Sequence, residues 1–291
     1  MRNLVVPETL DGWSVLHQMF RIDWRAWKRL EERRRQEIAA EAVEVLAGLE
    51  RPEKGASTFV NLLGHKGDLM LAHFRPSFQD LSEIELRLAQ TALHDYLVPT
   101  MSYVSVVELG LYEMTAKLHR ELSSQGLSPG SDEFEGAFDQ EMAKQRQRMM
   151  GRLFTDIPRR SLVCFYPMNK RRGEHKNWYG LPYEKRAALM REHGMIGRQY
   201  AGRVTQIISG SIGFDDWEWG VDRVADEPLV FKQLIYEMRF DEASADYAEF
   251  GPFYVGLQFP AAEIARLLAG RAPAQGPWPQ ADSNAGRKQG Q

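Results

Sequence analysis

SLVCFYPMNKRRGEHKNWYGLPYEKRAALMREHGMIGRQYAGRVTQIISGSIGFDDWEWGVD, residues 161–222, is the stretch that decides the fold. It opens with a short run of aromatic and β-branched residues, which is typical of a strand. In a strand through residues 161–170, Tyr166, Met168 and Lys170 share one face. Pro167 has no N–H to give to a neighbouring strand, so we expect an edge strand or its frayed end here.

A helix is expected next, over residues 182–193. Pro182 suits the first helical position, and Gly194 suits the stop after the last turn. His193 then lies in the last turn among apolar neighbours, where a histidine is more often packing than a metal ligand. The helix C-terminus also favours a cation, whereas a metal-binding imidazole is neutral. These residues alone make a ligand role for His193 the minority interpretation.

Composition narrows the function classes. The chain has 291 residues, 43% of them hydrophobic, which is enough for a substantial core. Its 37 basic and 40 acidic residues give a net charge of −3, so no basic excess indicates a nucleic-acid partner. The single cysteine, Cys164, lies in an apolar strand and is typical of a protein of the reducing cytoplasm. No run approaches the ~20 apolar residues of a membrane span, and a signal peptide's apolar region is missing.

The other elements follow one order twice, β-α-β-β-α-β, which predicts an α+β protein made of two ferredoxin-like halves. In the first half we expect a strand at 13–22, a helix at 24–49, strands at 57–64 and 68–74, a helix opened by the capping-box pair Ser82 and Glu85, and a strand at 102–109. In the second half we expect a strand at 161–168, the helix at 182–193, strands at 202–208 and 216–223, a helix at 227–238 and a strand at 253–258.

These predicted elements divide the chain into four segments. The N-terminal half spans residues 1–112, and the C-terminal half, with the candidate site, spans 161–260. Residues 113–160 form an extended connection, with a loop at 123–132 and an amphipathic helix after it. Residues 261–291 form a C-terminal extension, with a helix turn or two at 261–269 and a Pro-, Gly- and Gln-rich tail that predicts disorder.

Five separate motifs recur in the order and spacing of a known family: YPMNKR at 166–171, NWY at 177–179, MREHG at 190–194, GSIGFDDWEWG at 210–220 and YEMRFDEAS at 236–244. Together they resemble the coproheme decarboxylases of the chlorite dismutase superfamily, over roughly residues 10–258. The resemblance implies two ferredoxin-like halves that form a dimeric α/β barrel within each subunit, and a ring of subunits, a homopentamer.

The resemblance also implies a reaction. Two of the four propionates of iron-coproporphyrin III (coproheme) become vinyl groups, hydrogen peroxide is consumed, carbon dioxide is released and haem b is the product. The iron porphyrin is both substrate and redox centre. A coproporphyrin ferrochelatase is the implied transient partner.

Roles for individual residues follow from the same resemblance. His193 takes the position of the proximal iron ligand. Tyr166 takes that of a tyrosine whose phenoxyl radical removes a hydrogen atom from a propionate. Lys170 fits a propionate anchor or proton source, because an ammonium pairs with a carboxylate and shifts its pKa when buried; the alternative is an exposed charge. The further implied substrate contacts are Tyr112, Arg152, Met168, Trp178, Arg239 and Ser244.

Two of these contacts have plain structural alternatives: packing for Trp178 and a helix-end ion pair for Arg239. Gln206 separates the branches of the superfamily. It interrupts the apolar row of Val204 and Ile208 on the strand at 202–208. Chlorite dismutases carry an arginine over the distal iron face, whereas a glutamine there resembles the decarboxylases with a catalytic tyrosine. The alternative is a glutamine bonded to backbone on an edge strand.

Three functions compete at this point. The first is peroxide-dependent coproheme decarboxylation. The second is another haem enzyme of the superfamily, a peroxidase or a chlorite-splitting protein, which Tyr166 and the absence of arginine at position 206 oppose. The third is a haem carrier or sensor, for which His193 and the anchors would suffice without Tyr166.

Overall fold

The computed structural model describes residues 6–276 and confirms the α+β class. Its contacts divide the chain into two compact units. The first contains the residues up to Leu16 together with Tyr103–Val255, and the second contains His17–Ser102 together with the residues from Gly256. Every predicted site residue lies in the first unit, so the site is described there.

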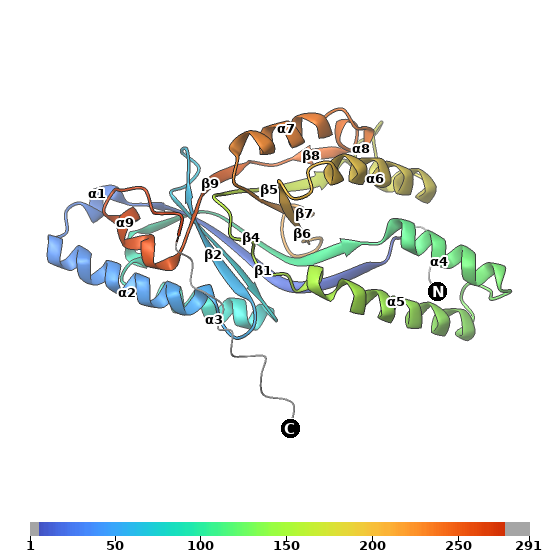
Figure 1. The fold of residues 1–291 in the computed structure, drawn as a ribbon, viewed down its shortest axis with the longest axis horizontal. Helices are drawn as coiled ribbons and strands as arrows, with labels where there is room; N and C mark the ends of the chain where they lie inside the picture. Colours follow the sequence, from blue (N-terminus) through green and yellow to red (C-terminus); the bar gives the residue numbers. More distant parts are fainter. Residues whose placement is uncertain (1–5, 277–291) are drawn as a thin grey trace, which may run out of the picture. The chain divides into compact units, whose positions relative to one another are not determined.

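The elements alternate along the chain as the sequence predicts (Figure 1). The strands are β1 (Thr9–Ile22), β2 (Ala56–Leu62), β3 (Leu69–Arg75), β4 (Leu97–Gly110), β5 (Leu162–Lys170), β6 (Thr205–Gly210), β7 (Trp219–Ala225), β8 (Ala248–Phe250) and β9 (Tyr254–Phe259). The α-helices are α1 (Trp24–Trp27), α2 (Glu32–Glu50), α3 (Phe78–Ala89), α4 (Tyr112–Ser124), α5 (Asp132–Leu153), α6 (Tyr183–Arg198), α7 (Pro228–Met238), α8 (Glu242–Ala245) and α9 (Ile264–Leu268). Short 3-10 turns lie at His94–Tyr96, Trp178–Gly180 and Ala261–Glu263.

Each βαββαβ series forms a ferredoxin-like strand order. The first runs β4-β1-β3-β2 and the second β9-β5-β7-β6. In the second series, β7 pairs antiparallel with both β5 and β6. Tyr166 lies opposite Val221, and Arg223 lies opposite both Cys164 and Gln206. Because directly opposed residues point to the same side of a sheet, Tyr166, Arg223 and Gln206 share one face.

Helices α6 and α7 pack against each other in this half (Figure 1). A Cβ at Gly197 on α6 would lie 3.6 Å from the terminal methyl of Met238 on α7, an ordinary packing distance, so the two helices approach each other closely here. Apolar residues at helical spacing, among them Val230, Phe231 and Leu234, form the buried face of α7. The face of the sheet that carries Tyr166 and Arg223 is therefore joined to α7 through Met238, which Arg223 contacts.

The prediction that Pro167 marks an edge strand is wrong. β5 pairs with β7 on one side and with β8 on the other. β8 ends at Phe250, and the backbone N–H of Gly251 donates to the carbonyl of Pro167 at 2.9 Å. The neighbouring strand is thus interrupted opposite the proline, where no N–H from Pro167 is needed.

The predicted stop at Gly194 is also wrong. α6 continues to Arg198, so His193 lies inside the helix rather than in its last turn. A glycine in a helix interior costs only about 1 kcal/mol relative to alanine, which the surrounding helix tolerates. The argument from the helix C-terminus against a metal-binding His193 therefore does not apply.

Smaller differences concern helix boundaries. The expected helix at 24–49 is divided into α1, capped by Asp23, and α2. α3 begins at Phe78 with Ser77 as its N-cap, so the capping box at Ser82 and Glu85 is wrong. β6 begins at Thr205 and leaves Val204 outside the strand. In each case a polar cap or a turn close to the predicted boundary, rather than the hydrophobic pattern, decides where the element begins.

The connection after residue 112 contains a helix that the sequence did not reveal. α4 and α5 form a hairpin around their own apolar cluster, which includes Leu118, Leu122, Phe134 and Phe138. The expected turn of helix after Pro260 is confirmed by α9. The tail predicted to be disordered lies mostly outside the described residues, from residue 277 onward.

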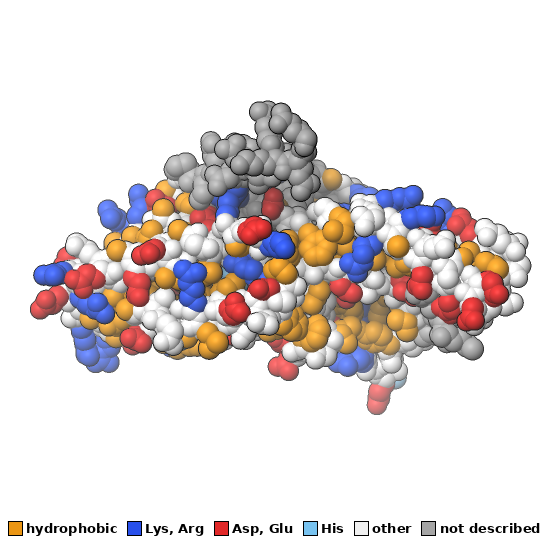
Figure 2. Space-filling model, turned by 90° about the horizontal axis from the view of Figure 1, so that it is seen from below, with side chains coloured by type: hydrophobic (Ala, Val, Ile, Leu, Met, Phe, Trp, Pro, Cys, Tyr) orange, Lys and Arg blue, Asp and Glu red, His pale blue; other side chains and the backbone are white. Residues whose placement is uncertain are grey.

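Charges of both signs alternate with apolar side chains over the face drawn in Figure 2. No helix within residues 6–276 is long and apolar enough to cross a membrane. Cys164 is buried, as its apolar strand predicts, and forms no disulfide with any described residue.

The start of α3 gives a test of the fold. The Ser77 hydroxyl accepts a hydrogen bond from the Asp80 backbone N–H at 3.1 Å, whereas Ser82 is exposed within the helix. We expect Ser77→Ala to lower the free energy of unfolding by about 1 kcal/mol in urea denaturation. Ser82→Ala is the matched control and should leave stability unchanged or slightly raised. A larger loss of stability in Ser82→Ala than in Ser77→Ala would place the helix start at the capping box instead.

Candidate functional site

His193 on α6 is held by a carboxylate. Its Nδ1 lies 3.0 Å from Oδ2 of Asp241, which is the N-cap of α8. A carboxylate only accepts hydrogen bonds, so in the neutral imidazole Nδ1 carries the hydrogen and Nε2 keeps its lone pair. Burial alone would raise the pKa of Asp241, but the hydrogen bond and charge of His193 and the N–H of Ser244 hold it below its usual value. This is the arrangement in which histidine serves as a metal ligand.

The Ser244 side chain lies in the same cluster. Its hydroxyl donates to Asp241 Oδ2 at 3.0 Å, and its oxygen is 3.4 Å from His193 Nδ1. Ser244 is buried and therefore orients the carboxylate that orients the imidazole. Its predicted contact with a propionate stays a prediction.

Lys170, at the end of β5, is a buried cation rather than an exposed one. Its Nζ donates to the carbonyl of Ala243 at 3.0 Å and lies 4.3 Å from the centre of the Trp178 ring. Burial lowers its pKa from 10.5 to about 8, although the carboxylates of Asp241 and Glu218 act in the opposite direction. An ammonium whose pKa is near neutrality can give up a proton, as the role of proton source requires.

Trp178 and Tyr112 extend this cluster. Their rings are 6.3 Å apart and meet edge to face, and the Tyr183 hydroxyl donates to the Tyr112 carbonyl. Trp178 also packs on Tyr247, at 5.7 Å between ring centres. Trp178 is 1% exposed, so packing accounts for it, while its contact with Lys170 places it beside the candidate chemistry.

Tyr166 is enclosed by aromatic rings and one cation. Its ring stacks on Phe253 at 4.5 Å and lies 5.8 Å from Phe250. The guanidinium of Arg223 is 5.2 Å from its ring centre. Burial raises the pKa of the phenol to about 12, although the charges of Arg223 and Arg239 lower it. The phenol therefore keeps its proton at neutral pH.

Arg223 is the main residue that the sequence analysis missed. It is 2% exposed, and its Nε donates to Oε1 of Gln206 at 2.9 Å. Its Nη2 contacts the sulfur of Met238 at 3.4 Å, and its Nη1 has no hydrogen-bond partner among residues 6–276. The signal that singled out Gln206, a polar residue in an apolar row, also applies to Arg223 between Val221 and Ala225.

β6 pairs with β7 along its whole length but with β4 only at Ser209 and Gly210, so Gln206 lies where one side of the strand is an unpaired edge. Its hydrogen-bond partner is the Arg223 side chain rather than the backbone. Gln206 and Ile208 are exposed, on the face that they share. This part of β6 is thus open on its unpaired side.

The remaining predicted substrate contacts differ in their distance from the other site residues. Arg239 is the C-cap of α7 and packs its guanidinium 4.1 Å from the Phe250 ring centre, beside Tyr166. It forms no ion pair with any described residue, so the helix-end ion pair is wrong. Met168 is half-buried on β5. Arg152 is exposed in the last turn of α5 and is not brought into contact with the others.

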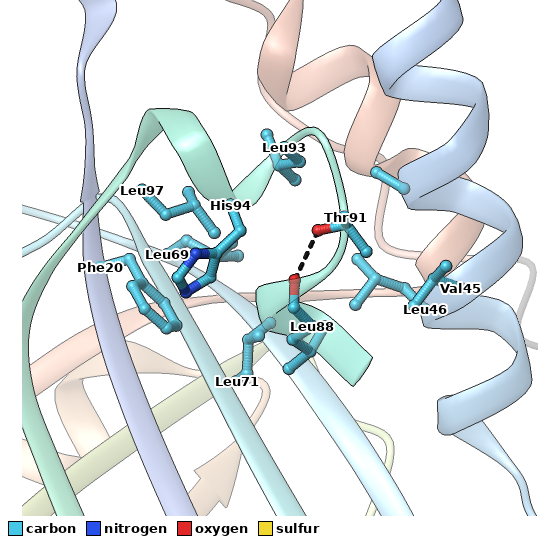
Figure 3. A pocket seen from close by; sticks show the side chains of 11 residues that line it. Phe20, Val45, Leu46, Leu69, Leu71, Leu88, Thr91, Leu93, His94 and Leu97 are labelled. Atoms are coloured by element: carbon cyan, nitrogen blue, oxygen red, sulfur yellow. Dashed lines mark hydrogen bonds between the residues drawn. The ribbon is translucent and has the colours of Figure 1, made fainter. Parts of the chain in front are cut away.

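A cavity and a surface depression among the described residues differ in whether they adjoin these side chains. One is an apolar cavity of about 20 Å³ in the second unit, lined mainly by leucines and Phe20 (Figure 3). Its Thr91 hydroxyl is already used, donating to the Leu88 carbonyl at 2.7 Å. This cavity contains none of the predicted site residues. The other is an open depression of about 680 Å³ over residues 169–176 and Glu249, which Lys170 borders.

Together the first unit offers an imidazole nitrogen, a buried phenol and two buried cations, with aromatic surfaces between them. This set suits a flat, anionic ligand that carries a metal ion, because each charge of such a ligand would meet an opposite charge here. Asp241 supplies the partner of His193, and the sequence signal for it was the Asp-x-x-Ser spacing of an N-cap.

Comparison with known proteins places this chain beside haem proteins. A family model described as chlorite dismutase matches residues 35–259. A solved structure described as a novel heme-binding protein from Thermus thermophilus is 39% identical, with a TM-score of 0.75, and the match covers 91% of this chain and 99% of that one. A mutant chlorite dismutase from Candidatus Nitrospira defluvii is similar in fold, at 19% identity and a TM-score of 0.67, with 89% and 96% covered.

Two curated relatives are longer proteins. A putative heme-binding protein of Natronomonas pharaonis is 43% identical over 266 residues, which is 90% of this chain and 42% of the relative. Another from Haloquadratum walsbyi is 42% identical over 270 residues, which is 92% and 48% respectively. This chain thus spans about half the length of these relatives.

The buried ammonium predicts a pH dependence. Between pH 8 and 10.5 the unfolded chain holds the Lys170 proton more tightly than the folded chain, so the free energy of unfolding should rise with pH. We expect this rise, about 2–3 kcal/mol, to disappear in Lys170→Met. Lys54→Met, at an exposed position, is the control. Parallel curves for the wild type and Lys170→Met, in urea unfolding between pH 7 and 10, would contradict the lowered pKa.

Proposed function

Because this chain belongs to the chlorite dismutase family, we propose that it binds iron-coproporphyrin III and, with hydrogen peroxide, decarboxylates two of its propionates to give haem b. The observation that carries the proposal is the pairing of an oriented histidine, His193, with a buried tyrosine, Tyr166, in one unit. Relatives named as heme-binding proteins support the porphyrin part. The motifs at 166–171 and 236–244 support the decarboxylase part.

The residues present fit an iron porphyrin. With Nδ1 of His193 engaged by Asp241, Nε2 is the nitrogen left for the iron. Lys170 is a buried ammonium, and Arg239 is a guanidinium near Tyr166. A porphyrin that carries carboxylates supplies the negative charge that these groups lack.

Each decarboxylation balances with one peroxide. A propionate, a proton and hydrogen peroxide give a vinyl group, carbon dioxide and two water molecules. When bound, the iron porphyrin supplies the redox chemistry that oxidises Tyr166. The phenoxyl radical removes a hydrogen atom from the propionate chain, which restores the phenol. The carboxylate then leaves as carbon dioxide as the second electron is removed.

Lys170 supplies charge and protons in this scheme. Its ammonium pairs with a propionate carboxylate, and its lowered pKa, about 8, lets it donate the proton that the balance requires. Tyr112, Arg152, Met168, Trp178 and Ser244 complete the proposed contacts with the substrate. We also propose a cytoplasmic homopentamer that receives its substrate from a coproporphyrin ferrochelatase.

A haem carrier or sensor is the second candidate, and the names of the relatives favour it. A carrier would need His193 and the cationic anchors but no buried phenol with a raised pKa. A peroxidase or a chlorite-splitting enzyme is less well supported, since position 206 holds a neutral amide.

Asp241 tests whether His193 is the iron ligand. Asp241→Asn keeps an N-cap for α8 but removes the negative charge beside Nδ1. We expect the midpoint potential of the iron-porphyrin complex to rise by on the order of 60 mV, a tenfold change for a one-electron couple, because the imidazole becomes a weaker donor. Potentiometric titration measures this. Asp246→Asn, in an exposed pair with Lys176, is the control and should not move the potential.

The reaction itself is tested with purified protein loaded with iron-coproporphyrin III. Peroxide is added in steps, and the products are separated and weighed by mass spectrometry. We expect an intermediate that lacks one carboxyl group, followed by haem b. Tight binding with bleaching alone would contradict decarboxylation and favour the carrier.

Tyr166→Phe separates binding from chemistry. We expect it to abolish decarboxylation while the dissociation constant for iron-coproporphyrin III changes by less than about threefold, the effect of one weak hydrogen bond. Tyr183→Phe, whose hydroxyl bonds a backbone carbonyl, is the control and should still turn over. Full decarboxylation by Tyr166→Phe would remove the radical role from this residue.

A further inference from the structure

The bond between Arg223 and Gln206 fixes which way an amide faces. A guanidinium has five N–H donors and no acceptor. Gln206 must therefore present its oxygen to Arg223, and the 2.9 Å contact from Nε to Oε1 has this direction. The amide nitrogen, which carries two donors, is left for any other partner of Gln206.

Arg223 is itself held in place. Met238 contacts its Nη2 on one side, and the ring of Tyr166 lies 5.2 Å from its guanidinium carbon. No carboxylate within residues 6–276 forms an ion pair with it, and its Nη1 has no hydrogen-bond partner there. An uncompensated buried charge acts strongly on the groups that it touches, because little water screens it. Gln206 is one of these groups.

The free end of Gln206 faces an open surface. Gln206 and Ile208 are exposed, in the part of β6 that pairs with β7 alone. Swinging the amide around would bring its N–H groups against a donor-only guanidinium, which costs at least the lost hydrogen bond. The amide therefore turns its oxygen toward Arg223 and its two N–H donors toward whatever occupies this surface.

We propose that Arg223 is a positioning residue that holds Gln206 as a one-way hydrogen-bond donor, so that the site favours anionic, hydrogen-bond-accepting ligands of the iron over neutral ones. This rests on the proposed function only in that it requires a bound iron porphyrin. Because Arg223 orients it, the neutral Gln206 would favour anionic ligands, as a positively charged side chain would.

Fluoride and imidazole are the two probes. Both bind ferric iron, but fluoride is an anion that accepts hydrogen bonds, whereas imidazole is neutral. The dissociation constant of each is measured from the absorbance of the ferric porphyrin complex. We expect Arg223→Met to weaken fluoride binding about tenfold, the worth of one hydrogen bond to a charged ligand, and to change imidazole binding less than twofold. Arg223→Lys, which keeps a donor-only cation, should recover most of the loss.

Gln206→Leu decides whether Arg223 acts through Gln206. We expect Gln206→Leu to weaken fluoride binding at least as much as Arg223→Met, and the double variant to be no weaker than Gln206→Leu alone, within about twofold. Arg33→Met, at an exposed position on α2, controls for the loss of a positive charge and should change nothing.

Three results would overturn the proposal: unchanged fluoride affinity in Arg223→Met, additive losses in the double variant, or loss of the porphyrin itself, which would make Arg223 a carboxylate anchor. If Arg223→Met does not fold, Gln206→Glu replaces it, because it pairs with Arg223 and presents acceptors alone. Wild-type fluoride affinity in Gln206→Glu would equally refute the proposal. A chain that binds the porphyrin without decarboxylating it refutes the proposed reaction and leaves this test intact, whereas a chain that binds no iron porphyrin overturns both.

Discussion

In the pairing of β7 with β5 and β6, each of residues 219–224 lies opposite one residue on β5 and one on β6. This register decides where the chemistry of the first unit lies. A slip of one residue would turn Tyr166 and Lys170 to the other face together, because side chains alternate along a strand. It would also part Arg223 from Gln206. Few single constraints in the chain have so many consequences.

A second set of constraints meets at the turn between α7 and α8. Asp241 caps α8 through the Ser244 N–H and at the same time fixes the imidazole of His193. Two residues further on, the carbonyl of Ala243 receives the ammonium of Lys170. One four-residue segment thus orients a candidate ligand from α6 and a candidate proton donor from β5. The helix cap and the site share the same atoms.

The sequence predicted the parts of the fold that depend on local pattern. Strand alternation placed Tyr166 and Lys170 on one face, and the repeated element order indicated the ferredoxin-like halves. It failed where distant segments decide. Pro167 could not reveal that its neighbouring strand stops at Phe250, and Gly194 could not reveal that α6 runs on to Arg198. α4 was missed because its apolar face is covered by α5, which follows a loop.

The same division holds for the site. The family motifs named His193, Tyr166, Lys170 and Gln206, and the structure shows their immediate surroundings. Local patterns could mark Asp241 as an N-cap and Arg223 as a polar residue in an apolar row. They could not show which residues these two contact, since the hydrogen bonds join residues 48 and 17 positions apart.

Neither compact unit is one continuous piece of chain. The first needs residues before Leu16 as well as Tyr103–Val255, and the second is resumed at Gly256. During synthesis β1 must wait for β3 and β4, which are made later in the chain, and the second unit closes only when β9 has emerged. Contacts of such long sequence separation make folding slow, and the nascent chain exposes unpaired strand edges in the meantime. This order of assembly leaves strand edges of the second unit without their partners until β9 has been made.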